Sequence, residues 1–291
     1  MLSEDMIEDV VFKLLKRAST SSPPDVVRAL NEAYEREDEP VPKMQLKAIL
    51  KNIEVAQENS LPLCQDTGVH IFFVKGNLKL IPYFKGFEDA IKRGVMKATE
   101  EVPLRPNAVH PITRKNPGNN IGVRMPYINY IPTDDPWIEI IAFPKGAGSE
   151  NMSFMSMLTP SQGLKGIKEF IIESVIKSGG KPCTPTVIGV GIGGTSDIAM
   201  HIAKEALLRP IGDRHPEKDI AELEEELLKA INEIGIGPMG LGGKTTVLDV
   251  HIEYAYCHTA SLPVAVNTQC WTGRRARARI YEDGRIEEME G

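Results

Sequence analysis

A chain of 291 residues with a net charge of −6 offers no basic surface for nucleic acid, so we expect no nucleic-acid partner. Its apolar runs are too short to cross a bilayer and its N-terminus is acidic, so we expect neither a membrane span nor a secretory signal and infer a cytoplasmic protein. With 42% hydrophobic and 25% charged residues, the composition is that of a globular protein with one large core or two lobes.

Residues 1–60 are expected to form a helical region. Apolar residues recur at helical spacing from Ile7 to Leu15. Pro24 and Pro42 stand where two further helices would begin, because proline is accepted in the first turn of a helix. This helical region should end just before Cys64.

Residues 61–291 carry mixed strand and helix signals, so we predict a mixed α/β (α+β) body that forms a single domain with residues 1–60. Strands are predicted at 69–74, 138–143, 187–190, 245–254, 262–266 and 275–281. Helices are predicted at 87–101, 163–177, 198–208 and 219–234. Residues 104–120 show no periodicity, and such a long irregular segment within a compact domain is usually functional or mobile.

Three segments far apart in the sequence each place a cysteine on a polar turn that glycine or proline keeps out of a helix. They are Leu63 to Gly68, Lys181 to Thr186 and Asn267 to Gly273. Cytoplasmic thiols stay reduced, so we expect Cys64, Cys183 and Cys270 to be ligands of one site in a central cleft rather than disulfides. Their spacing lacks the paired ligands of a zinc site and leaves open that they are unrelated. Cys257 lies in an apolar run and is expected in the core.

Two glycine-rich stretches suggest phosphate chemistry only weakly. Gly189-x-Gly191-x-x-Gly194 matches the dinucleotide fingerprint, but the acidic residue ending a second strand about 20 positions on is absent. The amides that follow it could still hold an anion or a cluster sulfide. Around Lys244 the pattern of a phosphate-binding loop is broken by Pro238, so we predict a close-packed turn with Lys244 directed at an anionic group.

Several isolated polar residues have both ordinary and functional interpretations. His258 stands at a strand end, where a lone histidine is more often structural than catalytic. Arg105 lies in the irregular segment and is either a solvated loop residue or a clamp for a carboxylate. The arginines along the terminal strand are expected to form a solvated or partner-facing edge: Arg274, Arg275, Arg277 and Arg279.

Taken together, these motifs resemble the iron–sulfur class I fumarate hydratases and the related L(+)-tartrate dehydratases. The match is to their alpha subunit, which corresponds to the N-terminal domain of single-chain forms, and covers essentially all of 1–291. The stretches that carry the resemblance are Leu63 to Gly68, Leu104 to Asn107, Lys145 to Asn151, Lys181 to Pro185, Gly191 to Thr195 and His258 through Trp271.

The resemblance implies a [4Fe–4S] cluster held by Cys64, Cys183 and Cys270. One iron would lack a protein ligand and would act as a Lewis acid on the hydroxyl and an adjacent carboxylate of a small dicarboxylate substrate. The cluster would thus assist the departure of hydroxide, which is a poor leaving group.

The resemblance also surrounds the substrate with polar groups from this chain. Asp66 would be an acid/base or an orienting group, His258 a donor to substrate oxygens, and Arg105 a carboxylate clamp. Gln65 would lie beside them, and the backbone near Ala147 and Gly148 could bind the other carboxylate.

The implied function is that of a hydro-lyase alpha subunit that reversibly hydrates fumarate to (S)-malate. L(+)-tartrate dehydration is the alternative. We place it second only because fumarate hydration is the more widespread metabolic need. We expect activity to need a beta subunit, in an α2β2 assembly, that supplies further carboxylate-binding groups and the proton-abstracting hydroxyl. Two other classes stay open: a non-catalytic iron–sulfur subunit with four protein ligands, and a nucleotide-dependent oxidoreductase.

Overall fold

The computed structural model describes residues 2–289 and divides into two compact units, each assembled from segments that are distant in the sequence. Unit 1 comprises Met1–Pro24, Asn52–Ala147 and Arg274–Gly291, and unit 2 comprises Asp25–Lys51 and Gly148–Gly273. Within residues 2–289 no helix is both long enough and apolar enough to span a membrane.

The helical region predicted at the start of the chain is confirmed. It consists of α1 (Glu4–Thr20), α2 (Pro24–Arg36) and α3 (Pro40–Asn59). Ser3 caps α1, because its hydroxyl accepts a hydrogen bond of 3.2 Å from the Met6 amide. Prolines begin α2 and α3, where a missing amide hydrogen costs nothing.

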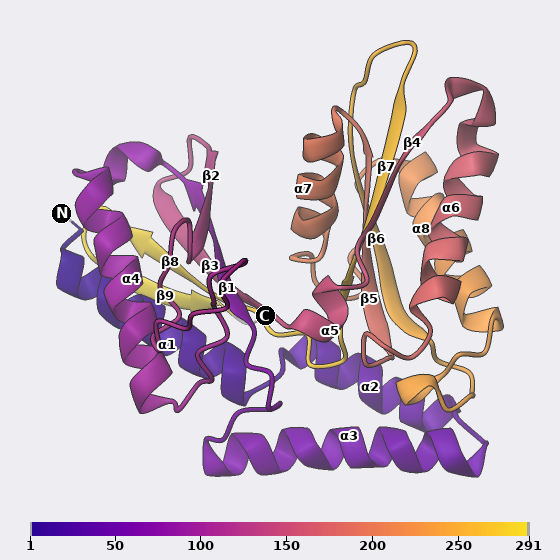
Figure 1. Ribbon diagram of the computed structural model, residues 1–291, viewed down its shortest axis with the longest axis horizontal. Coiled ribbons are helices and arrows are strands. Elements are labelled where there is room, and N and C mark those ends of the chain that lie inside the picture. Colours follow the sequence, from indigo (N-terminus) through magenta and orange to yellow (C-terminus); the bar gives the residue numbers. More distant parts are fainter. Residues whose placement is uncertain (1, 290–291) are drawn as a thin grey trace. The chain divides into compact units, whose positions relative to one another are not determined.

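Unit 1 is built on a five-stranded sheet in the order β2-β1-β3-β8-β9, with α1 and α4 over one face (Figure 1). Its elements are β1 (Val69–Gly76), β2 (Tyr127–Pro132), β3 (Trp137–Lys145), β8 (Ala276–Tyr281), β9 (Ile286–Met289) and α4 (Phe84–Glu101), with a short 3-10 turn at Leu78–Leu80. Only the β1–β2 pair is parallel. Alternate residues such as Phe72 and Val74 face the helices and form the core with Val11 and Ile91.

Unit 2 is built on a four-stranded sheet in the order β4-β7-β5-β6. Its elements are β4 (Phe154–Leu158), β5 (Thr186–Gly193), β6 (Val247–Ala255), β7 (Leu262–Gln269), α6 (Gly163–Ser178), α7 (Ser196–Ala206) and α8 (Lys218–Glu233). Short helical turns lie at Ala147–Glu150 (α5), Pro160–Gln162 and Pro238–Gly240. Helix α7 covers one face, and α6 and α8 cover the other (Figure 1).

The glycine pattern of β5 has a packing reason. A Cβ on Gly189 would lie 2.1 Å from the carbonyl oxygen of Ala203, and one on Gly191 would lie 2.0 Å from that of Ala199. These glycines therefore allow α7 to approach the strand closely.

The turn around Lys244 is close-packed, as predicted. Its amide donates to Glu37 and its Nζ lies 2.7 Å from an Asp38 carboxylate oxygen. The anionic group expected near Lys244 is thus found in the chain itself.

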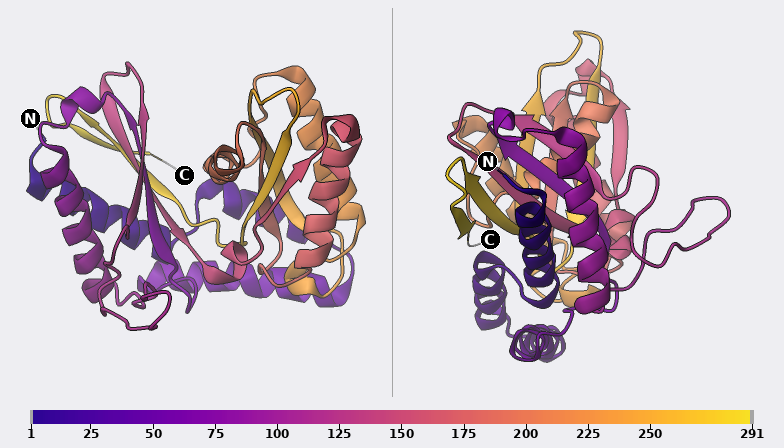
Figure 2. Two further views of the ribbon diagram at one scale, coloured as in Figure 1. Left: turned by 45° about the horizontal axis from the view of Figure 1, so that its top comes forward. Right: turned by 90° about the vertical axis from the view of Figure 1, so that its left-hand side faces the viewer.

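The prediction of a mixed α/β fold is confirmed, and each predicted helix and strand overlaps one that forms. Strands β2, β4 and β9 were not predicted. Residues 102–126 contain no helix or strand beyond an isolated bridge between Gly122 and Met125, and Figure 2 shows this segment projecting from unit 1. The assignment of 1–291 to a single domain stays a prediction.

The prediction that the terminal strand is a solvated or partner-facing edge is wrong, because this strand is not at the edge of its sheet. Strand β8 lies between β3 and β9, because the turn at Asp283–Gly284 adds β9 outside it. Arg274 and Arg275 are only 2% and 4% exposed. Arg279 donates to Glu139 at 3.1 Å and stacks over Trp137.

Candidate active site

The first cysteine lies on an ordered turn of unit 1, residues 64–68, which we call the Cys64 turn. Its approach is fixed by the Leu63 amide, which donates to the Ser19 carbonyl at 2.8 Å, and by Asn52, whose side chain donates to the Leu63 carbonyl at 2.9 Å. Cys64 and Asp66 are half-buried, and Gln65 is exposed. The turn thus presents these three side chains from a fixed backbone.

The Asp66 carboxylate is engaged at both oxygens. Oδ1 accepts from the Gly68 amide at 2.9 Å and from Asn107 Nδ2 at 3.2 Å, and Oδ2 accepts from the Ala147 amide at 2.7 Å. Hydrogen bonds to a carboxylate are strong and directional. Asp66 therefore ties the Cys64 turn to the Arg105 segment and to the loop after β3.

Arg105 has a fixed backbone and an exposed side chain. Its amide donates to Thr67 Oγ1 at 3.0 Å, and its carbonyl accepts from the buried Asn120 at 3.1 Å. Asn120 also accepts from the Asn107 amide at 2.7 Å and so organises the irregular segment. Within residues 2–289 the Arg105 guanidinium has no hydrogen bond or ion pair, which leaves it available to an anionic ligand.

Ala147 and Gly148 are exposed at the start of the four-residue helix α5. The Ala147 amide is already bound to Asp66, so it is not available to a substrate carboxylate in this arrangement. Of the two predicted backbone donors, only the Gly148 amide has no recorded partner among the described residues.

Two of the three predicted cysteine ligands lie at the same end of the unit 2 sheet. Val187, at the start of β5, pairs with Gln269, which directly precedes Cys270, and the Trp271 amide donates to the Cys183 carbonyl at 3.3 Å. Cys183 has a φ of 59°, a backbone conformation that L residues rarely adopt and that often marks functional sites.

The thiols themselves are partly accessible. Cys64, Cys183 and Cys270 are each half-buried, and Cys270 Sγ lies 3.0 Å from Thr272 Oγ1. Among the described residues no cysteine forms a disulfide, and neither unit by itself groups three Cys, His, Asp or Glu side chains as metal ligands. Cys64 belongs to unit 1, whereas Cys183 and Cys270 belong to unit 2.

His258 lies at the opposite end of that sheet. It occupies the turn between β6 and β7, after Ala255, which pairs with Gly193 at the far end of β5 (Figure 1). Strand β7 has eight residues and separates this turn from Cys270, a distance of roughly 25 Å at about 3.3 Å per residue. The structure therefore does not bring His258 to Cys183 and Cys270 of the same chain.

The prediction that Cys257 is a core cysteine is wrong. Strand β6 ends at Ala255, so the apolar run continues into an exposed turn where Tyr256 is 92% exposed. Cys257 is exposed too, and its thiol donates to the Ser261 carbonyl at 3.2 Å.

The sequence analysis missed the burial of Arg274, which contacts Asp66, and of His70, which lies near Arg274. Arg274 donates from its Nη1 atom to the Asp66 carbonyl at 2.5 Å. His70 is 1% exposed, and neither of its ring nitrogens has a hydrogen-bond partner among the described residues. Burial and the nearby charge of Arg274 lower the pKa of His70 to about 4, so its ring is neutral near pH 7. The regular arginine spacing concealed Arg274, because it is typical of a solvated strand.

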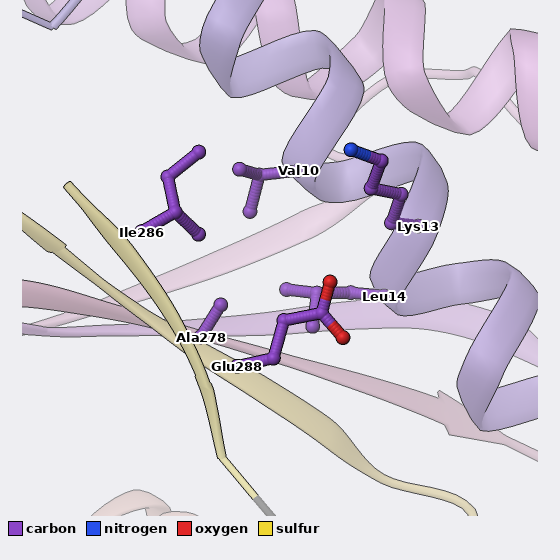
Figure 3. A pocket seen from close by; sticks show the side chains of 6 residues that line it. All are labelled: Val10, Lys13, Leu14, Ala278, Ile286 and Glu288. Atoms are coloured by element: carbon purple, nitrogen blue, oxygen red, sulfur yellow. The ribbon is translucent and has the colours of Figure 1, made fainter. Parts of the chain in front are cut away.

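The cavities recorded in unit 1 lie away from these residues. One of about 150 Å³ lies between α1 and the β8–β9 hairpin, with Lys13 and Glu288 among its lining residues (Figure 3). Another of about 330 Å³ lies within residues 108–125 of the irregular segment, and a third of about 410 Å³ lies between α4 and residues 122–128. None of the three is lined by a predicted site residue.

Comparison with known proteins gives consistent matches along the whole chain. A family model described as fumarate hydratase (Fumerase) matches residues 8–279. A Methanocaldococcus jannaschii protein, provisionally named L(+)-tartrate dehydratase subunit alpha, is 55% identical over 284 residues, covering 96% of this chain and 99% of the relative. The L(+)-tartrate dehydratase subunit alpha of Escherichia coli K12 is 34% identical over 285 residues, covering 97% and 93%.

Proposed function

This chain belongs to the fumarate hydratase (Fumerase) family, a family of hydro-lyases, and we propose that it is the alpha subunit of an iron–sulfur enzyme that removes water from a four-carbon hydroxy dicarboxylate. The observation that carries the proposal is the Asp66 network, which joins the Cys64 turn, the Arg105 segment and the loop at Ala147. Three of the stretches behind the family resemblance thus meet at one carboxylate.

L(+)-tartrate is the favoured substrate. The named relatives are L(+)-tartrate dehydratase alpha subunits, and they support this reading more strongly than the fumarate hydration ranked first from the sequence. Fumarate and malate are the second candidate substrate pair, because the family is described as fumarate hydratase. Both reactions expel a hydroxyl from one carbon and a proton from the next, so the same groups serve either substrate.

We assign a [4Fe–4S] cluster to Cys64, Cys183 and Cys270, because cysteine thiolates are the usual ligands of such clusters. Cys183 and Cys270 emerge at one end of a sheet, and all three thiols are partly accessible and outside disulfides. When bound, the cluster supplies a Lewis acid for the leaving hydroxyl.

Of the two roles considered for Asp66, its contacts favour the orienting one. Hydrogen bonds from Gly68, Asn107 and Ala147 engage both carboxylate oxygens and hold the group in one orientation. We therefore assign the proton-abstracting base to the beta subunit and give Asp66 the task of holding the Cys64 turn.

The carboxylates of the substrate need cationic and amide donors. The side chain of Arg105 is exposed and its guanidinium has no partner among the described residues, so this planar group can clamp one carboxylate bidentately. Gln65 is exposed one residue away from Asp66 and can bond the substrate through its amide. The Gly148 amide is the remaining backbone donor for the second carboxylate.

His258 can serve such a site only from a second alpha chain. It lies roughly 25 Å from Cys183 and Cys270 of its own chain, since the length of β7 intervenes. A small dicarboxylate cannot bridge that distance. This separation supports the two alpha copies of the proposed α2β2 assembly.

The test uses the alpha chain together with its matching beta subunit, with the cluster reconstituted anaerobically. We expect turnover of L-tartrate with a kcat/KM above that of malate, and a change in the cluster spectrum when substrate is added. Cys64→Ser, Cys183→Ser and Cys270→Ser should lose bound iron, whereas Cys257→Ser should keep it. A higher kcat/KM for malate would favour fumarate hydratase, and a loaded complex that neither turns over nor responds to dicarboxylates would favour a non-catalytic subunit.

A further inference from the structure

Arg274 is a buried cation without a carboxylate partner. Its side chain is 2% exposed, its Nε atom has no hydrogen-bond partner, and within residues 2–289 it forms no ion pair. An unpaired buried charge is costly, so a protein retains one where its contacts serve a purpose. The contact recorded for Arg274 is the hydrogen bond to the Asp66 carbonyl.

The backbone and the carboxylate of Asp66 are held by different groups. Arg274 binds the carbonyl oxygen, while the Gly68 amide of the same turn and amides from two other segments bind the carboxylate. Gly146 lies between the two attachments, because a Cβ there would be 2.7 Å from Arg274 Nη2 and 3.2 Å from Asp66 Oδ2. Arg274 thus restrains the rotation of the Asp66 backbone that the carboxylate contacts alone leave free.

The surroundings of Arg274 strengthen this restraint. His70 lies on β1 next to it, is almost fully buried, and offers no recorded hydrogen bond to Arg274. In a region that excludes water, a hydrogen bond from a charged donor is stronger than at an exposed position. His70 therefore does not compete with the Asp66 carbonyl for the hydrogen-bond donors of Arg274.

We propose that Arg274 is a positioning residue of the active site, which acts through the Asp66 carbonyl to hold the Cys64 turn in the geometry that presents Gln65 to the substrate. The inference rests on the proposed function for its catalytic consequence. Its structural consequence, the rigidity of the Cys64 turn, can be measured without any turnover.

Hydrogen exchange of the full complex gives the first readout. In Arg274→Gln the peptide covering residues 61–70 should exchange roughly tenfold faster, because local opening is no longer opposed by the buried hydrogen bond. Arg274→Lys should recover part of the protection, since lysine keeps the charge but not the planar fork. Arg279→Gln, which makes the same substitution five residues further on in β8, is the matched control, and its exchange at 61–70 should equal that of the wild type.

Kinetics give the second readout. Displacing reacting groups by about 1 Å can cost roughly 100-fold in rate, so Arg274→Gln should lower kcat roughly 10- to 100-fold with little change in KM. Combined with Asp66→Asn, the second substitution should add little, because both residues act through one turn. Full additivity would contradict the proposal.

Unchanged exchange at 61–70 in Arg274→Gln, or an equal increase at 136–143, would overturn the positioning role. If Arg274→Gln does not fold, the same comparison is made with Arg274→Lys, for which an intermediate rate is expected and a wild-type rate contradicts the proposal. If the wild-type complex turns over neither substrate, the proposed function fails, while the exchange result still decides the role of Arg274.

Discussion

At the scale of single residues, a methyl group added at Gly146 should lower the catalytic rate without loss of the bound cluster. An alanine Cβ would lie 2.7 Å from Arg274 Nη2 and 3.2 Å from Asp66 Oδ2, so one of these groups must move. We expect Gly146→Ala to lower kcat by roughly tenfold or more, while bound iron stays within the range of the wild type. Steady-state kinetics with iron and sulfide analysis measure both quantities.

Gly122→Ala is the control for that substitution. No atom lies within 4 Å of a Cβ at Gly122, and its φ is not in the left-handed region. Its kcat should be unchanged. A Gly146→Ala enzyme as fast as this control would show that Arg274 and Asp66 tolerate displacement.

His70 should make unit 1 sensitive to acid. Burial, then the charge of Arg274, lower the folded-state pKa of His70 to about 4 from the ordinary 6.5. The unfolded chain therefore binds the extra proton between these values, and the free energy of unfolding should fall by roughly 3 kcal/mol as pH drops from 6.5 to 4.

His70→Leu removes this titration. Because neither ring nitrogen has a partner, the substitution should cost little stability at pH 7. Urea unfolding at pH 7 and at pH 4.5 should show a smaller difference for the variant than for the wild type. Equal differences would mean that His70 titrates normally in the folded chain.

At the scale of elements, a buried carboxylate attaches β6 to the segment that follows α7. Asp249 accepts hydrogen bonds from the Gly212 amide, from Arg214 and from His251. Burial acts to raise the pKa of Asp249, but these hydrogen bonds outweigh it and lower the pKa to about 2.

This shift makes a second pH-dependent contribution to stability. Here the folded state favours the charged form of the group, whereas at His70 it favours the neutral form. A carboxylate with a lowered folded pKa stabilises the protein above its ordinary pKa of 3.8, and the contribution, roughly 2 kcal/mol, is lost as pH falls toward 2. Asp249→Asn should therefore be destabilised at pH 7 and lose less stability than the wild type between pH 4 and pH 3. Asp134→Asn, at an exposed position, makes the same charge change and should unfold like the wild type in both conditions.

Most elements could be predicted from the sequence because their signals are local. The three N-terminal helices have helical apolar spacing, and β1 and β5 are rich in β-branched and aromatic residues. Strand β4 was missed because its sequence, Phe-Met-Ser-Met-Leu, has no β-branched residue, and β9 because two of its four residues are glutamates.

The site could be predicted only in part, because its contacts connect distant segments. The polar turns made Cys64, Cys183, Cys270 and Asp66 candidates, but no local pattern shows that the Ala147 amide binds Asp66. The burial of Arg274 was not predicted, because its contact with the Asp66 carbonyl joins two segments 208 residues apart. The position of His258 follows from the antiparallel pairing of β7 with β5, which the sequence does not reveal.

At the scale of the whole molecule, the separation of His258 from Cys183 and Cys270 leads to a prediction about how the proposed active site is assembled. His258 and Cys270 flank the eight-residue strand β7, so they lie at opposite ends of one rigid sheet. If both serve the same substrate, they must come from two alpha chains. Two inactive variants should then complement each other.

The experiment combines an alpha chain carrying Cys270→Ser with one carrying His258→Asn, each with its own affinity tag and with beta subunit present. Each variant alone should be inactive. In an assembly purified through both tags, one of the two symmetric sites receives an intact cysteine set from one chain and His258 from the other, so about half of the wild-type activity should return. If His258 instead acted within its own chain, neither site would be complete and the mixed assembly would be as inactive as its parents.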